Sequence, residues 1–323
     1  FSIFHFQLEK KPFFMKKIIL LLLCISFLGK TNAQQETAFS QYHLNHFLFN
    51  PAATGASNLH SVSAHLRAQW TGLPNAPKTG SISYQAPLGK IGLGASLFSD
   101  RVASLNRFGA SFAYAYRSKI NQYTLSVGIV GQYQRFYLDR SAIDGVEDQG
   151  DLVIHDAMNG LNIYDANLGV YFYNKKMYVG FSVPNIIQAR LNTIGTNLST
   201  LAQLSRQYLF IAGYKYLPTK GLFSVEPSIL LRKVETLPFQ ALLTLKIGVM
   251  NERFFTAFTY GTSDVITMTA GCQILPEAKI AYSYDYALGD LYRYTRGSHE
   301  LSIIWEFGKQ NFKKMPPPKR FKG

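Results

Sequence analysis

Acidic side chains gather in one stretch of the chain, between residues 134 and 162. Carboxylates at such short spacing can bind Ca²⁺. The spacing does not match an EF-hand loop, whose ligands follow fixed positions within twelve residues. We therefore interpret the stretch as a solvated surface loop. Its acids are Asp139, Asp144, Glu147, Asp148, Asp151 and Asp156.

Histidine and serine are the other residue types that could do chemistry. The histidines at positions 43, 46, 60, 65, 155 and 299 are scattered, and no C-x-x-C pair offers the remaining ligands of a zinc site. The G-x-S-x-G pattern of a serine hydrolase does not occur. Ser298 and His299 are neighbours, so on a strand they would point to opposite faces and could not act together. The sequence predicts no enzyme, no cofactor and no metal site.

Charged residues also occupy polar positions within segments that alternate between apolar and polar side chains. If these segments are strands of a closed barrel, the charges face its interior, where each requires a partner. We favour a ladder of ion pairs that fills the interior over the lining of a selective pore. The set comprises Arg67, Arg107, Arg117, Lys215, Lys246, Lys279, Asp165, Glu226, Asp285, Glu300 and Glu306.

The start of the sequence reads as an export signal. Met15 is followed by two lysines, by an apolar run over 18–28 and by Ala33, the layout of a secretory signal peptide with cleavage after Ala33. We interpret residues 1–14 as lying upstream of the start codon. The formal charge is +14, of which residues 1–33 contribute five lysines and one glutamate, so the remainder has +10. Because the chain is exported, its basic character does not indicate nucleic acid as a partner.

The exported part is rich in aromatic residues and alternates with a period of two. The chain has 20 Tyr and 24 Phe, and beyond residue 33 no apolar run is long enough for a transmembrane helix. Ala278, Ile280, Tyr282, Tyr284 and Tyr286 illustrate the pattern, because small and polar residues lie between them. Only helices and closed barrels satisfy every backbone group in lipid. An all-β fold, a transmembrane antiparallel β-barrel, is therefore predicted.

Such segments number about 14, an even count typical of bacterial barrels. We expect strands at 60–70, 78–86, 90–99, 107–116, 121–133, 163–173, 176–183, 207–216, 222–232, 238–249, 252–261, 265–274, 277–286 and 297–307.

Long and short connections between these segments take turns along the chain. The long ones include 134–162, 184–206 and 287–296, and the short ones between them are typical of periplasmic turns. This arrangement places both termini in the periplasm. The predicted organisation is an upstream and signal segment at 1–33, an N-terminal periplasmic or plug segment at 34–58, an outer-membrane barrel at 59–308 and a basic tail at 309–323.

Short motifs across the exported part resemble those of one family. QYHLN at 41–45 and FNPAATG at 49–55 are similar to the Q-Y, N-P-A and G pattern at the start of the PorP/SprF family. RAQWTG at 67–72 and APKT at 76–79 resemble its R-x-Q-W-x-G and A-P-x-T block, and GSHEL at 297–301 resembles its G-S-H-E motif.

The resemblance implies an outer-membrane component of the type IX secretion system. It implies a role in secretion or surface attachment of large proteins such as gliding adhesins. The expected partners are outer-membrane lipid, the carboxy-terminal domain of a cargo protein and other type IX components. The alternative is a channel or transporter for small or hydrophobic solutes.

The motifs near the first strand and near the last strand should meet, because these two strands are neighbours in a closed barrel. There they would form an aromatic and proline platform for cargo, since Trp and Arg are favoured anchors at interfaces. The alternative is that they only lock the seam of the barrel. The candidate partner-binding residues are Arg67, Trp70, Gly72, Pro77, Thr79, Ser298, His299 and Glu300.

Overall fold

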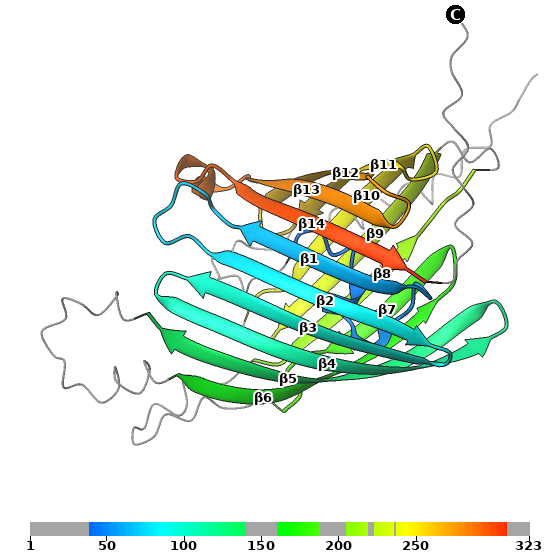
Figure 1. Cartoon of the computed structure of the whole chain (residues 1–323). Coiled ribbons are helices and arrows are strands. Elements are labelled where there is room, and N and C mark those ends of the chain that lie inside the picture. Colours follow the sequence, from blue (N-terminus) through cyan, green and yellow to red (C-terminus); the bar gives the residue numbers. More distant parts are fainter. Residues whose placement is uncertain (1–38, 140–159, 188–204, 219–222, 236, 309–323) are drawn as a thin grey trace, which may run out of the picture. The chain divides into compact units, whose positions relative to one another are not determined.

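The computed structural model describes residues 39–139, 160–187, 205–218, 223–235 and 237–308 (Figure 1). The predicted signal peptide, most of the acidic loop and the basic tail lie outside these residues. Within the described ranges, no helix is long and apolar enough to cross a membrane.

Fourteen strands form one closed antiparallel barrel, as predicted. Each strand pairs with its neighbours in sequence, and β1 closes the ring by pairing with β14 (Figure 1). The strands are β1 (His60–Ala68), β2 (Lys78–Leu88), β3 (Ile91–Val102), β4 (Leu105–Ile120), β5 (Tyr123–Leu138), β6 (Leu161–Tyr173), β7 (Met177–Val183), β8 (Gln207–Tyr214), β9 (Phe223–Val234), β10 (Gln240–Val249), β11 (Phe254–Gly261), β12 (Val265–Gln273), β13 (Ala278–Ala287) and β14 (Ser298–Phe307).

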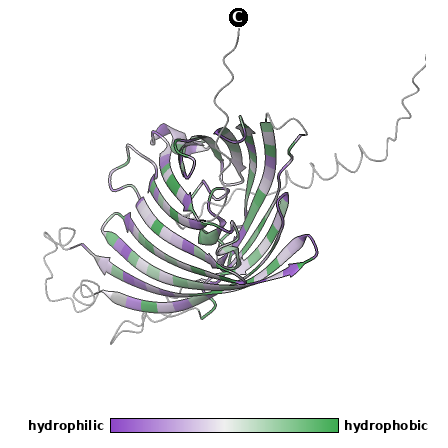
Figure 2. Cartoon of the chain, turned by 45° about the vertical axis from the view of Figure 1, so that its right-hand side comes forward, coloured by the Kyte–Doolittle hydropathy of each residue, from purple (hydrophilic) through white to green (hydrophobic). Residues whose placement is uncertain are grey.

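Alternation of side chains gives the wall an apolar outer face and a mostly polar inner face. In β14, Glu300 and Ser302 are buried in the interior, whereas Ile303 and Trp305 are exposed on the outside. Figure 2 shows the same change of hydropathy from residue to residue along the strands. Exposed apolar side chains on the outside are suited to lipid, and their alternation explains why the strand positions could be predicted.

Several connections differ from the prediction. β4 continues through the connection expected at 117–120, so its turn to β5 comprises Asn121 and Gln122. β5 and β6 continue beyond their expected ends, so the long loop covers 139–160 instead of 134–162. The connection expected at 100–106 is a two-residue turn of Ala103 and Ser104, because β3 and β4 also extend further.

The ladder between β8 and β9 is interrupted. It runs as far as the pair Gly213 and Ser228, and resumes only as an isolated bridge between Tyr216 and Val225. Pro227 lies in the interruption, and proline has no N–H to donate to a neighbouring strand. β8 therefore ends at Tyr214, two residues earlier than predicted.

The connections define two ends of the barrel. End A carries the start of β1, the end of β14 and the turns between β2 and β3, β4 and β5, β6 and β7, β8 and β9, β10 and β11, and β12 and β13. End B carries the remaining connections, including residues 69–77, 139–160, 184–206 and 288–297. The long connections thus gather at end B, as expected for a bacterial barrel.

Residues 40–58, which we name the plug, lie inside the barrel (Figures 1 and 2). The plug contains two short 3₁₀ helices, η1 (His46–Leu48) and η2 (Pro51–Ala53). Asn50 caps η2 by accepting a hydrogen bond from the Ala52 N–H, and η2 packs against β4, β5, β6 and β7. Tyr42 and Ala52 are fully buried, so the plug forms part of the core.

Candidate functional site

A buried cluster of charges joins three strands near end B. The Arg67 guanidinium lies 2.6 Å from Asp285 Oδ2 on β13 and 2.9 Å from Glu300 Oε2 on β14. All three side chains occupy lumen-facing positions, and the Thr267 hydroxyl donates to Asp285 at 2.7 Å. A guanidinium between two carboxylates satisfies charges that would be costly alone. We name Arg67, Asp285 and Glu300 the seam clamp.

The seam clamp also holds the beginning of the plug. The Ser40 N–H donates to Glu300 Oε2 at 2.7 Å, and the Ser40 hydroxyl donates to Asp285 at 2.8 Å. The Gln41 side-chain amide donates to Ser283 Oγ and to the Glu300 carbonyl. The clamp therefore fixes both the wall and the plug, which explains why Arg67 and Glu300 point inward and not to the surface.

Further along, the plug makes hydrogen bonds across the whole interior. Asn45 donates to Ser63 Oγ at 2.7 Å, and Asn50 donates to the Val170 carbonyl at 3.0 Å. At end A, Arg117 donates to Asn58 Oδ1 at 3.1 Å and to the Gly55 carbonyl. The Gln-Tyr and Asn-Pro-Ala motifs are thus interior contacts that lead from end B to end A.

Glycines of the wall make room for the plug. A Cβ at Gly92 would lie 2.1 Å from the Thr54 carbonyl oxygen, and one at Gly128 would lie 2.5 Å from the Ala52 nitrogen. A Cβ at Gly169 would lie 2.1 Å from Asn50 Oδ1. Real Cβ atoms do not approach so closely, so these positions accept only glycine while the plug is in place.

Two histidines of the plug lie next to β6, β7 and β10, His43 being buried and His46 half-buried. Burial lowers the pKa of His43 to about 3, and the charge of Lys246 acts in the same direction. Burial lowers the pKa of His46 to about 4, and its Nδ1 lies 2.8 Å from the Tyr171 hydroxyl. Both rings are therefore neutral at pH 7, which is the state that burial favours.

At end B the motif that follows β1 meets the motif that begins β14, as predicted. The Trp70 N–H donates to Ser298 Oγ at 3.1 Å, the Thr71 N–H donates to the Gly297 carbonyl at 2.8 Å, and the Arg296 N–H donates to the Thr71 carbonyl at 2.7 Å. Trp70 has φ of 48° and Gly297 has φ of 83°, so both lie in the left-handed region. These bonds join residues 69–77 to residues 288–297.

The candidate residues divide between this junction and the interior. Trp70 and Gly72 lie in the loop, and Gly72 faces the Arg296 side chain. Thr79 was expected to contribute to the platform, but it lies in β2 and its hydroxyl donates to Asp100 in the lumen at 2.7 Å. His299 lies on the outer face, where its ring contacts Tyr282.

Pro77 and Ser298 are buried at the junction. The Pro77 carbonyl accepts a bond from the Gln69 N–H at 2.9 Å. Ser298 and His299 point to opposite faces of β14, so they cannot pair as nucleophile and base.

Sequence reasoning missed the exposed residues of the connection between β13 and β14. It contains η5 (Asp290–Arg293) and presents Tyr292 and Tyr294, which are 48% and 70% exposed, together with Arg293 and Arg296. The signal available was the composition of this stretch, DLYRYTR, which is unusually rich in Tyr and Arg. We name Trp70–Gly72 and Leu291–Gly297 together the seam platform.

The interior charges form pairs elsewhere too. Lys246 lies 3.2 Å from Glu226, Arg107 lies 3.3 Å from Asp100, and Lys279 lies 2.9 Å from Glu306. Ion pairs expected from the sequence are thus present in the interior, but the partners to which Arg117 donates are Asn58 and backbone carbonyls. Within the described ranges no group of three or more potential His, Cys, Asp or Glu ligands could hold a metal ion.

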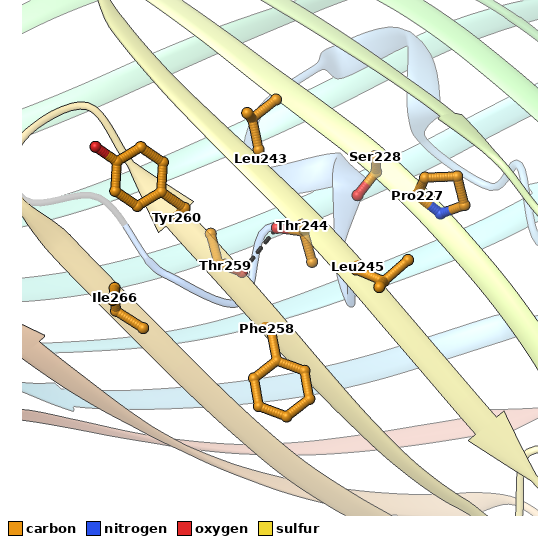
Figure 3. Close-up of a pocket in the computed structure, with 9 residues that line it drawn as sticks. All are labelled: Pro227, Ser228, Leu243, Thr244, Leu245, Phe258, Thr259, Tyr260 and Ile266. Carbon is orange, nitrogen blue, oxygen red and sulfur yellow. Dashed lines mark hydrogen bonds between the residues drawn. The ribbon is translucent and has the colours of Figure 1, made fainter.

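An apolar depression of about 350 Å³ lies on the outer face across β9 to β12 (Figure 3). Leu243, Leu245, Phe258 and Tyr260 surround it, and all four are exposed on the outside of the barrel. The polar groups of its lining are the hydroxyls of Ser228, Thr244, Thr259 and Tyr260.

A closed antiparallel barrel with an apolar outer face and a polar, plugged interior is an outer-membrane β-barrel protein. The family model of the type IX secretion system membrane protein PorP/SprF matches residues 31–305, and the chain belongs to this family. The protein is accordingly an outer-membrane barrel of the type IX secretion system.

Among curated proteins no relative matches the sequence. Solved structures that resemble the chain include the toluene transporter TbuX of Ralstonia pickettii, at 13% identity and a TM-score of 0.49, covering 80% of this chain and 92% of that protein. The outer membrane protein Omp33 of Acinetobacter baumannii has 7% identity and a TM-score of 0.47, with coverage of 77% and 98%. The P. putida toluene transporter TodX has 8% identity and a TM-score of 0.46, with coverage of 81% and 93%.

Proposed function

We propose that the protein holds secreted cargo at the cell surface, and that the seam platform is the surface on which the folded carboxy-terminal domain of a cargo protein docks. Large surface proteins such as gliding adhesins are the proposed cargo. The observation that carries this proposal is the Tyr- and Arg-rich connection at end B, fixed by hydrogen bonds to the Trp70 loop.

The composition of the seam platform suits a protein interface. Tyrosine, tryptophan and arginine supply most of the binding energy at many interfaces. Because Thr71 bonds to both Gly297 and Arg296, the platform loses little conformational freedom when a partner binds. Arg67 and Glu300 act one layer below, as supports of the platform.

The plug argues against the alternative of an open channel. It crosses the lumen between the two ends, and its hydrogen bonds reach β1, β6 and β14. Solute could pass only if this network broke. We therefore propose that secreted cargo reaches the platform through other components of the type IX system and not through this lumen.

The test compares variants of the platform with a matched control. Tyr292→Ala with Tyr294→Ala, and separately Trp70→Ala, should reduce cargo display at least tenfold, measured by flow cytometry of labelled surface cargo. Tyr216→Ala removes an equally exposed tyrosine at end A and should leave display unchanged. Heat-dependent gel migration reports whether the barrel has folded. Normal display on a folded Tyr292→Ala, Tyr294→Ala barrel would refute the proposal, and loss of folding in Trp70→Ala would mean that Trp70 only locks the seam.

A further inference from the structure

Exposed cations line part of the mouth of the barrel at end A, between β2 and β11. They lie in or beside four of its turns: Lys90 between β2 and β3, Lys119 between β4 and β5, Lys175 and Lys176 between β6 and β7, and Arg253 between β10 and β11. All five are exposed, and none forms an ion pair within the described part of the chain. We name these five residues the cationic ring.

The register of the strands turns several of these cations toward the mouth. Lys90 continues the lumen-facing positions of β3, where Gly92 contacts the plug. Lys119 lies two residues after Arg117, which is buried in the interior and bonds to the plug. Arg253 precedes buried Phe255 by two residues. Because alternate residues share a face, Lys90, Lys119 and Arg253 are directed toward the aqueous opening and not into lipid.

Few acids balance this charge. At end A, Glu252 is already paired with Lys215 at 2.6 Å, and Glu306 is paired with Lys279. Among the described residues of the end A turns, Glu277 is the one acid left for five cations. End B differs, since its longest loop carries the acidic run between Asp139 and Asp156.

The charge of the ring decides what can cover it. The basic tail of this chain begins after Gly308 at the same end and contains six Lys and Arg residues and no acid, so it would be repelled. A second copy placed end A to end A would be repelled for the same reason. Lipid phosphates are disfavoured because the ring faces the opening. The remaining occupant is an acidic surface of another macromolecule.

We infer that the cationic ring is the docking surface for an acidic face of a periplasmic protein. The periplasmic location of the partner rests on the proposed function, which places end A inside the cell envelope. The ring itself does not depend on that placement. The partner covers the mouth at which the plug leaves the barrel, so it is held close to the Arg117 contacts.

Binding of a fluorescein-labelled polyglutamate peptide to the full-length protein in detergent tests the charge recognition. Lys90→Gln, Lys119→Gln and Lys175→Gln together should weaken binding about tenfold, since each exposed ion pair contributes modestly. Lys78→Gln, Arg101→Gln and Lys233→Gln remove the same charge at end B, outside the seam platform, and should have little effect. Added salt should weaken binding to the unaltered protein. Equal binding by both triple variants would overturn the inference.

Photo-crosslinking in cells tests the class of partner. A crosslinking amino acid at position 253 should capture a periplasmic protein with net negative charge, and capture should fall when Lys90, Lys119 and Lys175 are replaced by glutamine. Capture of phospholipid instead, or capture of protein that ignores the ring charges, would overturn the inference. Cargo display by the same variants is scored separately, so a failure of the platform at end B would not be mistaken for a failure of the ring.

Discussion

Arg67 on the first strand lies directly opposite Glu300 on the last strand, and their side chains meet at 2.9 Å inside the lumen. The same guanidinium reaches Asp285 on β13 at 2.6 Å. Arg67→Ala would leave two carboxylates buried without their cation, which costs about 3–5 kcal/mol when a buried pair is broken. We predict a lower unfolding temperature, measured by gel migration after heating. Arg101→Ala breaks an exposed pair with Asp139 and should cost at most about 1 kcal/mol. Equal losses in both variants would contradict the role of the clamp.

Gly128 tests the fit of the plug. Gly128→Ala places a Cβ within 2.5 Å of Ala52 N and of the Pro51 carbonyl carbon, both backbone atoms, so the plug must shift at a cost of about 1–3 kcal/mol. We predict more frequent current openings in planar bilayers than for the unaltered protein. Gly131→Ala is the matched control in the same strand, because a Cβ there meets nothing within 4 Å. If both variants stay silent and equally stable, the plug is not fitted as tightly as these contacts require.

Gly297 tests the left-handed turn of the seam platform. Gly297→Ala adds strain at φ of 83° and brings a Cβ within 2.7 Å of the Asp285 carbonyl oxygen. Gly89→Ala has a comparable φ of 61° with nothing within 4 Å of the added Cβ. Both variants pay about 1 kcal/mol for the left-handed conformation, but only the first also clashes. Surface labelling of cargo should fall for Gly297→Ala alone.

The two histidines of the plug predict that the stability of the seated plug depends on pH. Burial lowers the pKa of His43 to about 3 and that of His46 to about 4, from an ordinary value of 6.5. A released plug therefore binds protons at higher pH than a seated one does. Stability of the seated plug is complete above pH 6.5 and falls as pH decreases toward 4, by up to about 1.4 kcal/mol per pH unit for each histidine. Bilayer currents should rise on acidification, and His43→Asn with His46→Asn should remove this dependence. Bilayer currents that do not change with pH in the unaltered protein would contradict the prediction.

The strands could be predicted from sequence because one side of the wall meets lipid and the other meets a polar interior. Val62 and Leu66 are exposed while Ser63 and His65 are buried, and a period of two follows directly. The closing contact between motifs at 67–72 and 297–301 could also be inferred, since the first and last strands of a barrel must pair.

The path of the plug could not be predicted. Residues 40–58 show no period, because their partners come from many strands at once, as Asn45 with Ser63 and Asn50 with Val170 illustrate. The wall glycines were equally uninformative, since alternation puts both Gly128 and Gly248 on the lumen side, although a Cβ would meet the plug at Gly128 and Ser224 and Glu252 at Gly248. Whether a candidate side chain is buried or exposed depends on the exact strand ends, which patterns do not supply. The burial of Thr79 is an example.

The plug runs without interruption into β1, yet its first residues are held by β13 and β14. The amino-terminal segment must therefore wait for the last part of the chain to be made before its contacts are complete. Because β14 also pairs with β1, the strand that closes the wall supplies the last partners of the plug. Complete filling of the lumen consequently depends on the residues that close the barrel.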